Sequence, residues 1–140
     1  MSHQIILPRV MHIGKGASER VADTVKGLNC RNPLLVTDKV MVELGYSAAI
    51  VNILETAGIT VDVFSDTVPE PTVASISRGV DAFNTQPYDC IIALGGGSPI
   101  DSAKAIAILG KHGGQMKDYK FPRVVDEAGI PIIAIPTTAG

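Results

Sequence analysis

Residues 90–109 read Cys-Ile-Ile-Ala-Leu-Gly-Gly-Gly-Ser-Pro-Ile-Asp-Ser-Ala-Lys-Ala-Ile-Ala-Ile-Leu, and this stretch decides the fold. Its first five residues form a short, continuous apolar run rich in branched side chains, which is typical of a strand buried on both faces. Three glycines follow, and then come Ser98 and Pro99, which are favoured at the N-cap and at the first position of a helix. We therefore predict a strand, a glycine turn and a helix capped by Ser98.

The three glycines of this turn are Gly95, Gly96 and Gly97. The first N–H groups of a helix have no intrahelical partner, and the helix dipole adds roughly half a positive charge, so the turn favours an anion. Each glycine costs roughly 0.5–1 kcal/mol relative to alanine, and a tight turn needs only one or two. The surplus indicates close approach of a phosphate, although a plain strand-to-helix connection is an alternative. The standard dinucleotide fingerprint is not matched, because Ile100 stands where its third glycine would be.

The composition indicates one globular domain. The chain has 140 residues, of which 46% are hydrophobic and 19% charged. A net charge of −2 without a basic cluster argues against nucleic acid or anionic lipid as a partner. No apolar run is long enough for a signal peptide or a membrane helix. Cys30 and Cys90 are interpreted as buried small side chains, and together these features predict a cytoplasmic protein.

Strand-like and helix-like segments alternate along the chain. Short strands at residues 4–7 and 10–13 are expected at a sheet edge or against a partner subunit. The expected elements that follow are a helix capped by Ser18 (residues 18–28), a buried strand (34–36), a helix that breaks near Gly45 (40–54), a strand (60–64), an extended linker (69–71), a helix capped by Thr72 (72–83), and a last buried strand (131–135). This order predicts an α/β fold, with a parallel, Rossmann-like sheet covered by helices on both faces.

Polar residues follow the carboxyl ends of several predicted strands, where ligands bind in such sheets. Asp38 follows one strand, and its acceptor-only carboxylate suits the two hydroxyls of an adenosine ribose. A 2′-phosphate would meet like charge there, at a cost on the order of 1–3 kcal/mol, so NAD is favoured over NADP. The alternative for Asp38 is a simple helix cap. Asp38 also precedes the glycine turn, whereas the fingerprint's acidic residue follows it.

Three further polar residues leave two interpretations open. Asp101 completes a capping box with Ser98 or contacts a ligand. Thr137 and Thr138 follow the last strand and offer hydroxyl and N–H groups to a phosphate or ribose, or simply form a loop. The histidines lack the spacing of metal ligands, and no Ser-His-Asp arrangement is present, so no metal ligand and no catalytic acid or base is assigned.

Several motifs together resemble the iron-dependent, or group III, alcohol dehydrogenases. They are Gly-Gly-Gly-Ser-Pro-Ile-Asp-Ser-Ala-Lys at residues 95–104, the segments 34–39 and 135–140, Pro-Arg-Val at 8–10, Ile-Gly-Lys-Gly at 13–16, and Val-Pro-Glu-Pro-Thr at 68–72. That family includes lactaldehyde reductase and propanediol dehydrogenase. Glycerol dehydrogenase and dehydroquinate synthase are more distant relatives of it.

The resemblance implies that residues 1–140 form a single NAD-binding domain. In such a domain Asp38 contacts the adenosine ribose, residues 96–98 hold the pyrophosphate, and Pro69 lies by the adenine. Thr137 and Thr138 contact the cofactor nearer the nicotinamide.

The resemblance also implies the reaction, which is hydride transfer between a small alcohol or aldehyde and NAD, assisted by iron or zinc. In the family an aspartate and three histidines of a helical C-terminal domain bind that metal, and this domain is absent here. We therefore expect the 140 residues alone to be inactive, and the complete enzyme to be a homodimer or larger. The alternatives are a nucleotide-binding fragment without chemistry, or half of a polyol dehydrogenase or synthase of the same fold.

Overall fold

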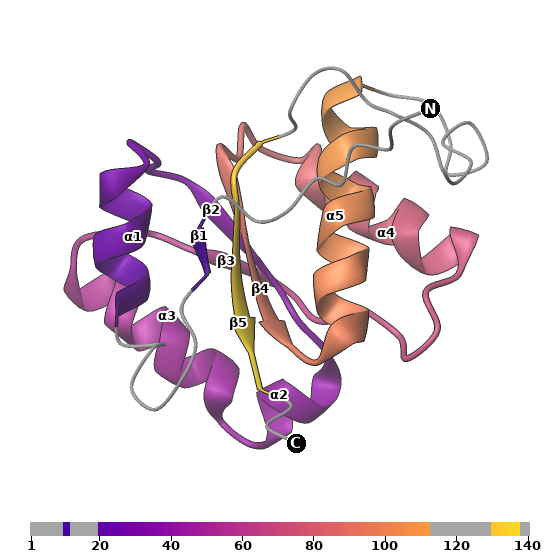
Figure 1. Ribbon diagram of the computed structural model, residues 1–140, viewed down its shortest axis with the longest axis horizontal. Coiled ribbons are helices and arrows are strands. Elements are labelled where there is room, and N and C mark those ends of the chain that lie inside the picture. The colour runs from indigo at the N-terminus through magenta and orange to yellow at the C-terminus, as the bar shows by residue number, and fades with distance from the viewer. Residues whose placement is uncertain (1–9, 12–19, 113–129, 138–140) are drawn as a thin grey trace, which may run out of the picture.

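A parallel sheet forms the centre of the molecule (Figure 1). The computed structural model describes residues 10–11, 20–112 and 130–137, and within them the sheet has five strands in the order β1-β5-β4-β2-β3. The strands are β1 (Val10–Met11), β2 (Pro33–Val36), β3 (Asp62–Phe64), β4 (Cys90–Gly95) and β5 (Ile132–Pro136). Every pairing between neighbouring strands is parallel.

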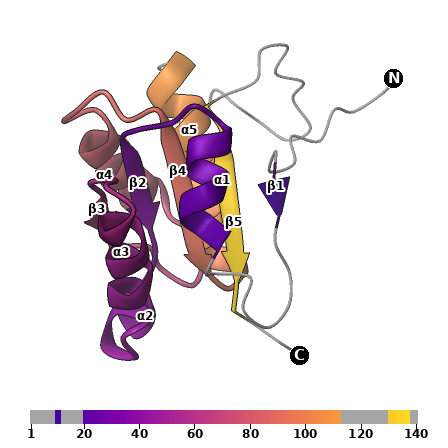
Figure 2. The ribbon, with the colours of Figure 1, turned by 90° about the vertical axis from the view of Figure 1, so that its left-hand side faces the viewer.

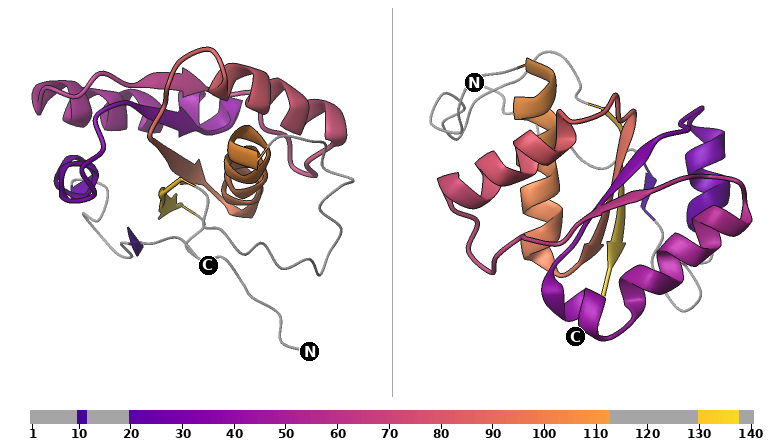
Figure 3. Two further views of the ribbon diagram at one scale, coloured as in Figure 1. Left: turned by 90° about the horizontal axis from the view of Figure 1, so that it is seen from above. Right: turned by 180° about the vertical axis from the view of Figure 1, so that it is seen from behind.

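Helices cover both faces of the sheet. They are α1 (Val21–Gly27), α2 (Lys39–Glu43), α3 (Tyr46–Thr56), α4 (Val73–Phe83) and α5 (Gly97–His112). Seen from above in Figure 3, α1 and α3 lie on one side of the sheet, and α4 and α5 on the other. The predicted Rossmann-like α/β architecture is confirmed.

The two central strands are buried on both faces, as their apolar runs predict. All four residues of β2 and all six of β4 are buried. Successive side chains of a strand point to opposite faces. Leu35 and Ile92 accordingly pack in the cluster that includes α1 and α3, whereas Leu34 and Ile91 pack in the cluster that includes α4 and α5. Two apolar layers therefore hold β2 and β4 rigidly in place.

The helix after the glycine turn begins two residues earlier than predicted. Gly97, not Pro99, starts α5, so Ser98 lies within the first turn. The Ser98 hydroxyl donates a hydrogen bond to the carbonyl oxygen of Pro69 at 2.5 Å. The predicted N-cap and the capping box with Asp101 are therefore wrong, because Ser98 lies inside the helix rather than before it.

Turn and cap signals elsewhere are mostly confirmed. The helical segment breaks at Gly45, which has a φ of 83° and separates α2 from α3. Thr72 caps α4 and forms a capping box with Ser75. At α1 the N-cap is Arg20, without a side-chain hydrogen bond, while Ser18 lies outside the described residues.

The first described strand, β1, lies at the edge of the sheet beside β5, as Figure 2 shows. Val10 is paired with Ile133 and Met11 with Ala134. The predicted edge position of this segment is confirmed, whereas the predicted strand at residues 4–7 lies outside the described residues. Among the helices that the structure describes, none combines the length and apolar character needed to cross a bilayer.

Candidate functional site

A cleft of about 770 Å³ opens at the carboxyl edge of the sheet. The segments that follow β2, β3, β4 and β5 all contribute to it, together with one residue of α4. Its lining consists of Asp38, Lys39, Val40, Met41, Asp66, Thr67, Val68, Pro69, Arg78, Gly96, Gly97, Ser98, Pro99 and Thr137. Four segments that are far apart in sequence therefore meet where the parallel fold predicts a ligand site.

The glycines of the turn have different roles. Gly95 has a φ of 136°, and a Cβ at this position would lie 2.8 Å from Cγ of Pro99, so backbone conformation and space both require glycine. Gly97 is exposed at the first turn of α5, and a Cβ there would meet no atom within 4 Å. The backbone N–H groups at the start of α5 are thus open to a ligand in the cleft.

Two buried threonines join the loops around the cleft. The Thr37 hydroxyl, which is fully buried, donates to the carbonyl oxygen of Leu94 at 2.8 Å. The Thr67 hydroxyl donates to the carbonyl oxygen of Thr37 at 2.7 Å. These bonds link the ends of β2 and β4 and the loop after β3, so the loop positions are fixed relative to one another.

The last strand is attached to the same rim. The Thr137 N–H donates to the carbonyl oxygen of Gly95 at 3.0 Å. The Thr137 hydroxyl lies 3.6 Å from Sδ of Met41, a residue of α2. Thr137 therefore stands between the glycine turn and α2, at the edge of the cleft.

Asp38 lies half-buried in the cleft and also caps α2. Its Oδ1 accepts a hydrogen bond from the Met41 N–H at 2.9 Å. The helix-cap interpretation of Asp38 is confirmed. The ribose contact stays a prediction, and the cap does not exclude it, since a carboxylate has two oxygens and about four acceptor positions.

Not all of the predicted site residues line the cleft. Gly95 shapes the turn without lining it, and Asp101 lies exposed on α5 outside the lining. Thr138 lies outside the described residues. Asp38, Pro69, Gly96, Gly97, Ser98 and Thr137 all line the cleft.

Charged residues that the sequence analysis did not select also reach the cleft. Lys39 and Arg78 bring two cations, and Asp66 brings a second carboxylate. Asp66 and Thr67 follow β3, so the carboxyl-end argument applied to Asp38 could have found them. Arg78 lies within α4, and its sequence neighbourhood gives no signal that it faces the cleft.

The fold and the cleft define a Rossmann-like domain that is suited to an anionic ligand at its carboxyl edge. The sequence profile of the family described as "Iron-containing alcohol dehydrogenase" matches residues 8–140. The chain therefore belongs to the iron-containing alcohol dehydrogenase family. Alcohol dehydrogenase 4 of Saccharomyces cerevisiae (strain YJM789) is 35% identical over 134 residues, which are 96% of this chain and 35% of that protein.

Solved structures agree with this assignment. The chain superposes on a 1,3-propanediol oxidoreductase with a TM-score of 0.89 and 31% identity, covering 100% of this chain and 37% of the other. The sulfoacetaldehyde reductase of Bifidobacterium kashiwanohense, solved in complex with NAD⁺, matches with a TM-score of 0.84 and 27% identity, again over 100% and 37%. The chain thus spans little more than a third of the length of these proteins.

The residues around the cleft do not suit the iron of the family name. In residues 10–11, 20–112 and 130–137, the lining comprises two carboxylates, Asp38 and Asp66, and neither histidine nor cysteine. Within the described residues, the one group of three possible metal ligands is Cys30, Asp89 and Cys90. This group lies near the amino ends of β2 and β4, whereas the cleft lies at their carboxyl ends. We therefore derive no catalytic step through a metal from the described part of the chain.

Proposed function

We propose that residues 1–140 form the NAD-binding domain of an oxidoreductase that transfers a hydride between a small alcohol or aldehyde and the cofactor. The observation that carries this proposal is the meeting of Asp38, the glycine turn and Thr137 around one cleft. Membership of the iron-containing alcohol dehydrogenase family supports the reaction, and the NAD⁺ complex of a structural neighbour supports the cofactor.

The described residues of the cleft suit each part of a dinucleotide. The N–H groups at the start of α5 would bind the pyrophosphate, and Gly97 leaves room for it to approach the backbone. Asp38 would accept hydrogen bonds from the adenosine ribose, and Pro69 would lie by the adenine. Thr137, at the other side of the turn, would contact the cofactor nearer the nicotinamide.

NAD, when bound, supplies the hydride acceptor or donor, and this chain supplies binding and orientation. The hydrogen bonds from Thr37 and Thr67 hold the cleft loops before the cofactor arrives. Such preorganisation lowers the entropy that must be lost on binding. We propose that substrate activation by a divalent metal, and assembly into a dimer or larger oligomer, depend on parts of the enzyme other than this cleft, and that the enzyme acts in the cytoplasm.

The replacement Asp38→Asn tests the proposal, because asparagine caps helices about as well as aspartate but lacks the charge. Calorimetric titration of the 140-residue chain with NAD⁺ and NADP⁺ should show that the wild type prefers NAD⁺. Asp38→Asn should weaken NAD⁺ binding by about tenfold, since a charged hydrogen bond of about 1.5–3 kcal/mol is replaced by a neutral one of about 0.5–1.5 kcal/mol. The variant should also reduce the difference between the affinities for NAD⁺ and NADP⁺.

Thermal unfolding of Asp38→Asn without cofactor is the control and should match the wild type, because the α2 cap is retained. A wild-type chain that binds neither NAD⁺ nor ADP-ribose would overturn the proposed function. An Asp38→Asn variant with unchanged cofactor affinities would instead overturn only the role of Asp38.

A further inference from the structure

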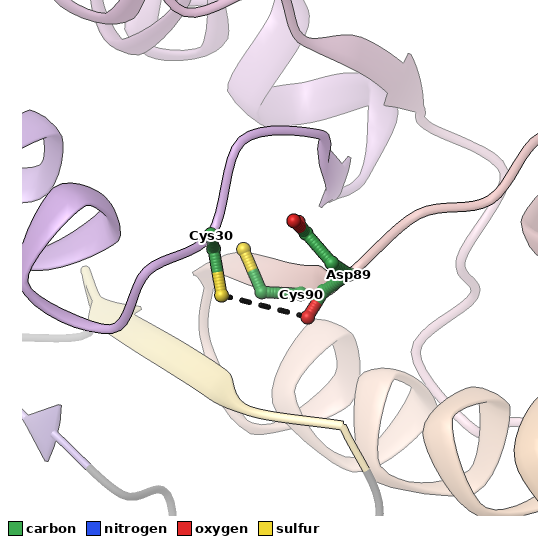
Figure 4. Close-up of side chains that lie close together, drawn as sticks. All are labelled: Cys30, Asp89 and Cys90. Atoms are coloured by element: carbon green, nitrogen blue, oxygen red, sulfur yellow. Dashed lines mark hydrogen bonds between the residues drawn. The ribbon is translucent and has the colours of Figure 1, made fainter.

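Three side chains with metal-binding atoms meet at the amino-terminal edge of the sheet, as Figure 4 shows. Cys30 comes from the segment between α1 and β2, Asp89 directly precedes β4, and Cys90 is its first residue. Their two sulfur atoms and a carboxylate oxygen all lie within 4.8 Å of one another. β4 has six residues, so the group lies roughly 17 Å from the glycine turn, at about 3.3 Å per residue.

The backbone around the group holds these side chains in place. The two Asp89 carboxylate oxygens accept hydrogen bonds from the N–H groups of Arg31, at 2.7 Å, and Asn32, at 2.9 Å. Cys30 Sγ lies 3.5 Å from the Asp89 carbonyl oxygen and 3.6 Å from that of Leu28. Each carboxylate oxygen keeps acceptor capacity beyond its N–H contact. Backbone contacts of this kind orient metal-binding side chains in known metal sites.

The donor set has a defined chemical preference. Two thiols and one carboxylate suit zinc and other thiophilic cations, whereas calcium and magnesium prefer all-oxygen sites. Zinc–sulfur bonds of about 2.3 Å in a tetrahedron place two sulfurs about 3.8 Å apart. The two sulfurs now lie within 4.8 Å of each other and therefore need to approach by at most about 1 Å.

We propose that Cys30, Cys90 and Asp89 form a binding site for a thiophilic divalent cation such as Zn²⁺, separate from the cofactor cleft. The cation forms bonds to the two sulfurs and to a carboxylate oxygen, the two S–H bonds break, and two protons pass to solvent. No electron is transferred. Three protein ligands leave a fourth tetrahedral position for water.

Burial sets the conditions for binding at this site. Cys90 is 0% exposed and Cys30 6% exposed, while Asp89 is half-buried and Arg31 beside it is exposed. Of the three ligand side chains, Asp89 is therefore the most accessible to solvent. Burial raises the pKa of the Cys90 thiol above its usual range, with a smaller contribution from Cys30. Because the cation must displace the thiol protons, the affinity rises with pH.

Titration of the reduced 140-residue chain with Cd²⁺ and Co²⁺ tests the site through the ultraviolet charge-transfer absorption of thiolate–metal bonds. The chain has only two cysteines, so this absorption reports on Cys30 and Cys90 alone, and the three histidines cannot produce it. We expect one cation per chain, two protons released, displacement of Co²⁺ by Zn²⁺, and no competition from Mg²⁺.

Cys30→Ala is the first variant, because Cys30 lies outside the strands, and it should abolish the stoichiometric absorption. Asp89→Asn should weaken binding by about 10- to 100-fold. Proton release by the wild type gives a second measurement that needs no variant. Wild-type chain without thiolate absorption at excess Cd²⁺, binding without proton release, or full absorption in Cys30→Ala would each overturn the proposal.

Discussion

Thr37 shows how one buried side chain positions several loops. Its hydroxyl binds the carbonyl oxygen of Leu94, its carbonyl oxygen accepts from Thr67, and its N–H donates to the carbonyl oxygen of Phe64 at 2.9 Å. A fully buried polar group is costly unless it is hydrogen-bonded, so all three bonds contribute to stability. The residue that precedes Asp38 thus connects three strand ends.

Thr67→Val should destabilise the chain by about 1–2 kcal/mol, because the Thr37 carbonyl oxygen loses the donor at 2.7 Å while the volume stays similar. Urea unfolding followed by circular dichroism measures the change. Thr67→Ser keeps the hydroxyl and should recover most of the loss. Equal destabilisation by serine and valine would show that the methyl group, not the hydrogen bond, matters.

Neighbouring glycines of the turn should respond in opposite ways. Gly95→Ala should cost about 1–3 kcal/mol of stability, because a Cβ at a φ of 136° is strained and lies 2.8 Å from Pro99. Gly97→Ala adds a Cβ in open space and should leave stability unchanged, yet weaken NAD⁺ binding if the pyrophosphate approaches there. Thermal unfolding and calorimetry on both variants separate the effects, and unchanged NAD⁺ binding by Gly97→Ala would count against this place for the pyrophosphate.

At the scale of elements, α4 and α5 approach each other closely through small residues. A Cβ on Gly79 of α4 would lie 2.3 Å from Cδ1 of Ile106, and one on Gly110 of α5 would lie 2.3 Å from Cδ2 of Phe83. These glycines allow the two helices to share one face of the sheet. The close packing of α4 also places Arg78 at the edge of the cleft.

Gly79→Ala should destabilise the chain by about 1–3 kcal/mol, because Ile106 is fully buried and cannot move away freely. Ile106→Val removes the nearest atom, so the double variant should recover part of the loss in a double-mutant cycle. Gly27→Ala in α1 meets no atom within 4 Å and serves as the control. Additive effects at Gly79 and Ile106 would contradict the contact.

Tyr88, just before β4, anchors the edge strand β3. Its hydroxyl donates to an Asp62 carboxylate oxygen at 2.5 Å. Burial, and then the hydrogen bond to Asp62, raise the pKa of Tyr88 above its ordinary value of 10.0. The neutral phenol is therefore favoured in the folded state. Its contribution to stability is complete below that ordinary value and is lost as the pH rises through the pKa of the folded state.

Tyr88→Phe should lower stability at neutral pH and flatten the decline of stability above about pH 10, since one group with a raised pKa is gone. Urea unfolding of the variant and the wild type, at neutral pH and at a series of alkaline pH values, measures the free energy of unfolding and its decline with pH. If this decline is equally steep in both proteins, Tyr88 does not cause the pH dependence.

At the scale of the whole molecule, much of the fold could be predicted from the sequence, because local chemistry determines it. Doubly buried strands are continuous apolar runs, as at residues 34–36 and 90–94, and caps and breaks have their own residues, as at Thr72 and Gly45. Parallel strands then bring their carboxyl ends to one edge, so six of the nine predicted site residues line the cleft.

The features that were missed depend on contacts across the sequence. Ser98 caps no helix because α5 already begins at Gly97, and the Ser98 hydroxyl instead donates to the carbonyl oxygen of Pro69, 29 residues away. Arg78 reaches the cleft because of the packing of α4, which its own sequence does not encode. Asp101 has the spacing of a capping-box residue relative to Ser98. Because α5 already starts at Gly97, Asp101 lies beyond the first turn of the helix, and it does not line the cleft.

The 140-residue chain should bind NAD⁺ without oxidising alcohols. Among the residues that the structure describes, the cleft lining includes neither histidine nor cysteine to hold a catalytic metal. The absorbance of reduced nicotinamide, followed with short alcohols and diols and with added Fe²⁺ or Zn²⁺, measures turnover. Metal-dependent alcohol oxidation by the purified chain would contradict this prediction and place the catalytic residues within it.

The position of β5 in the sheet has a consequence for biosynthesis. Although it is the last described strand in sequence, β5 lies inside the sheet, between β4 and β1. Until β5 has been synthesised, one edge of β4 has no partner strand, and β1 has no strand beside it. Exposed strand edges are sites of aggregation. The nascent chain therefore needs protection until residue 136 has emerged from the ribosome and β5 can pair with β4 and β1.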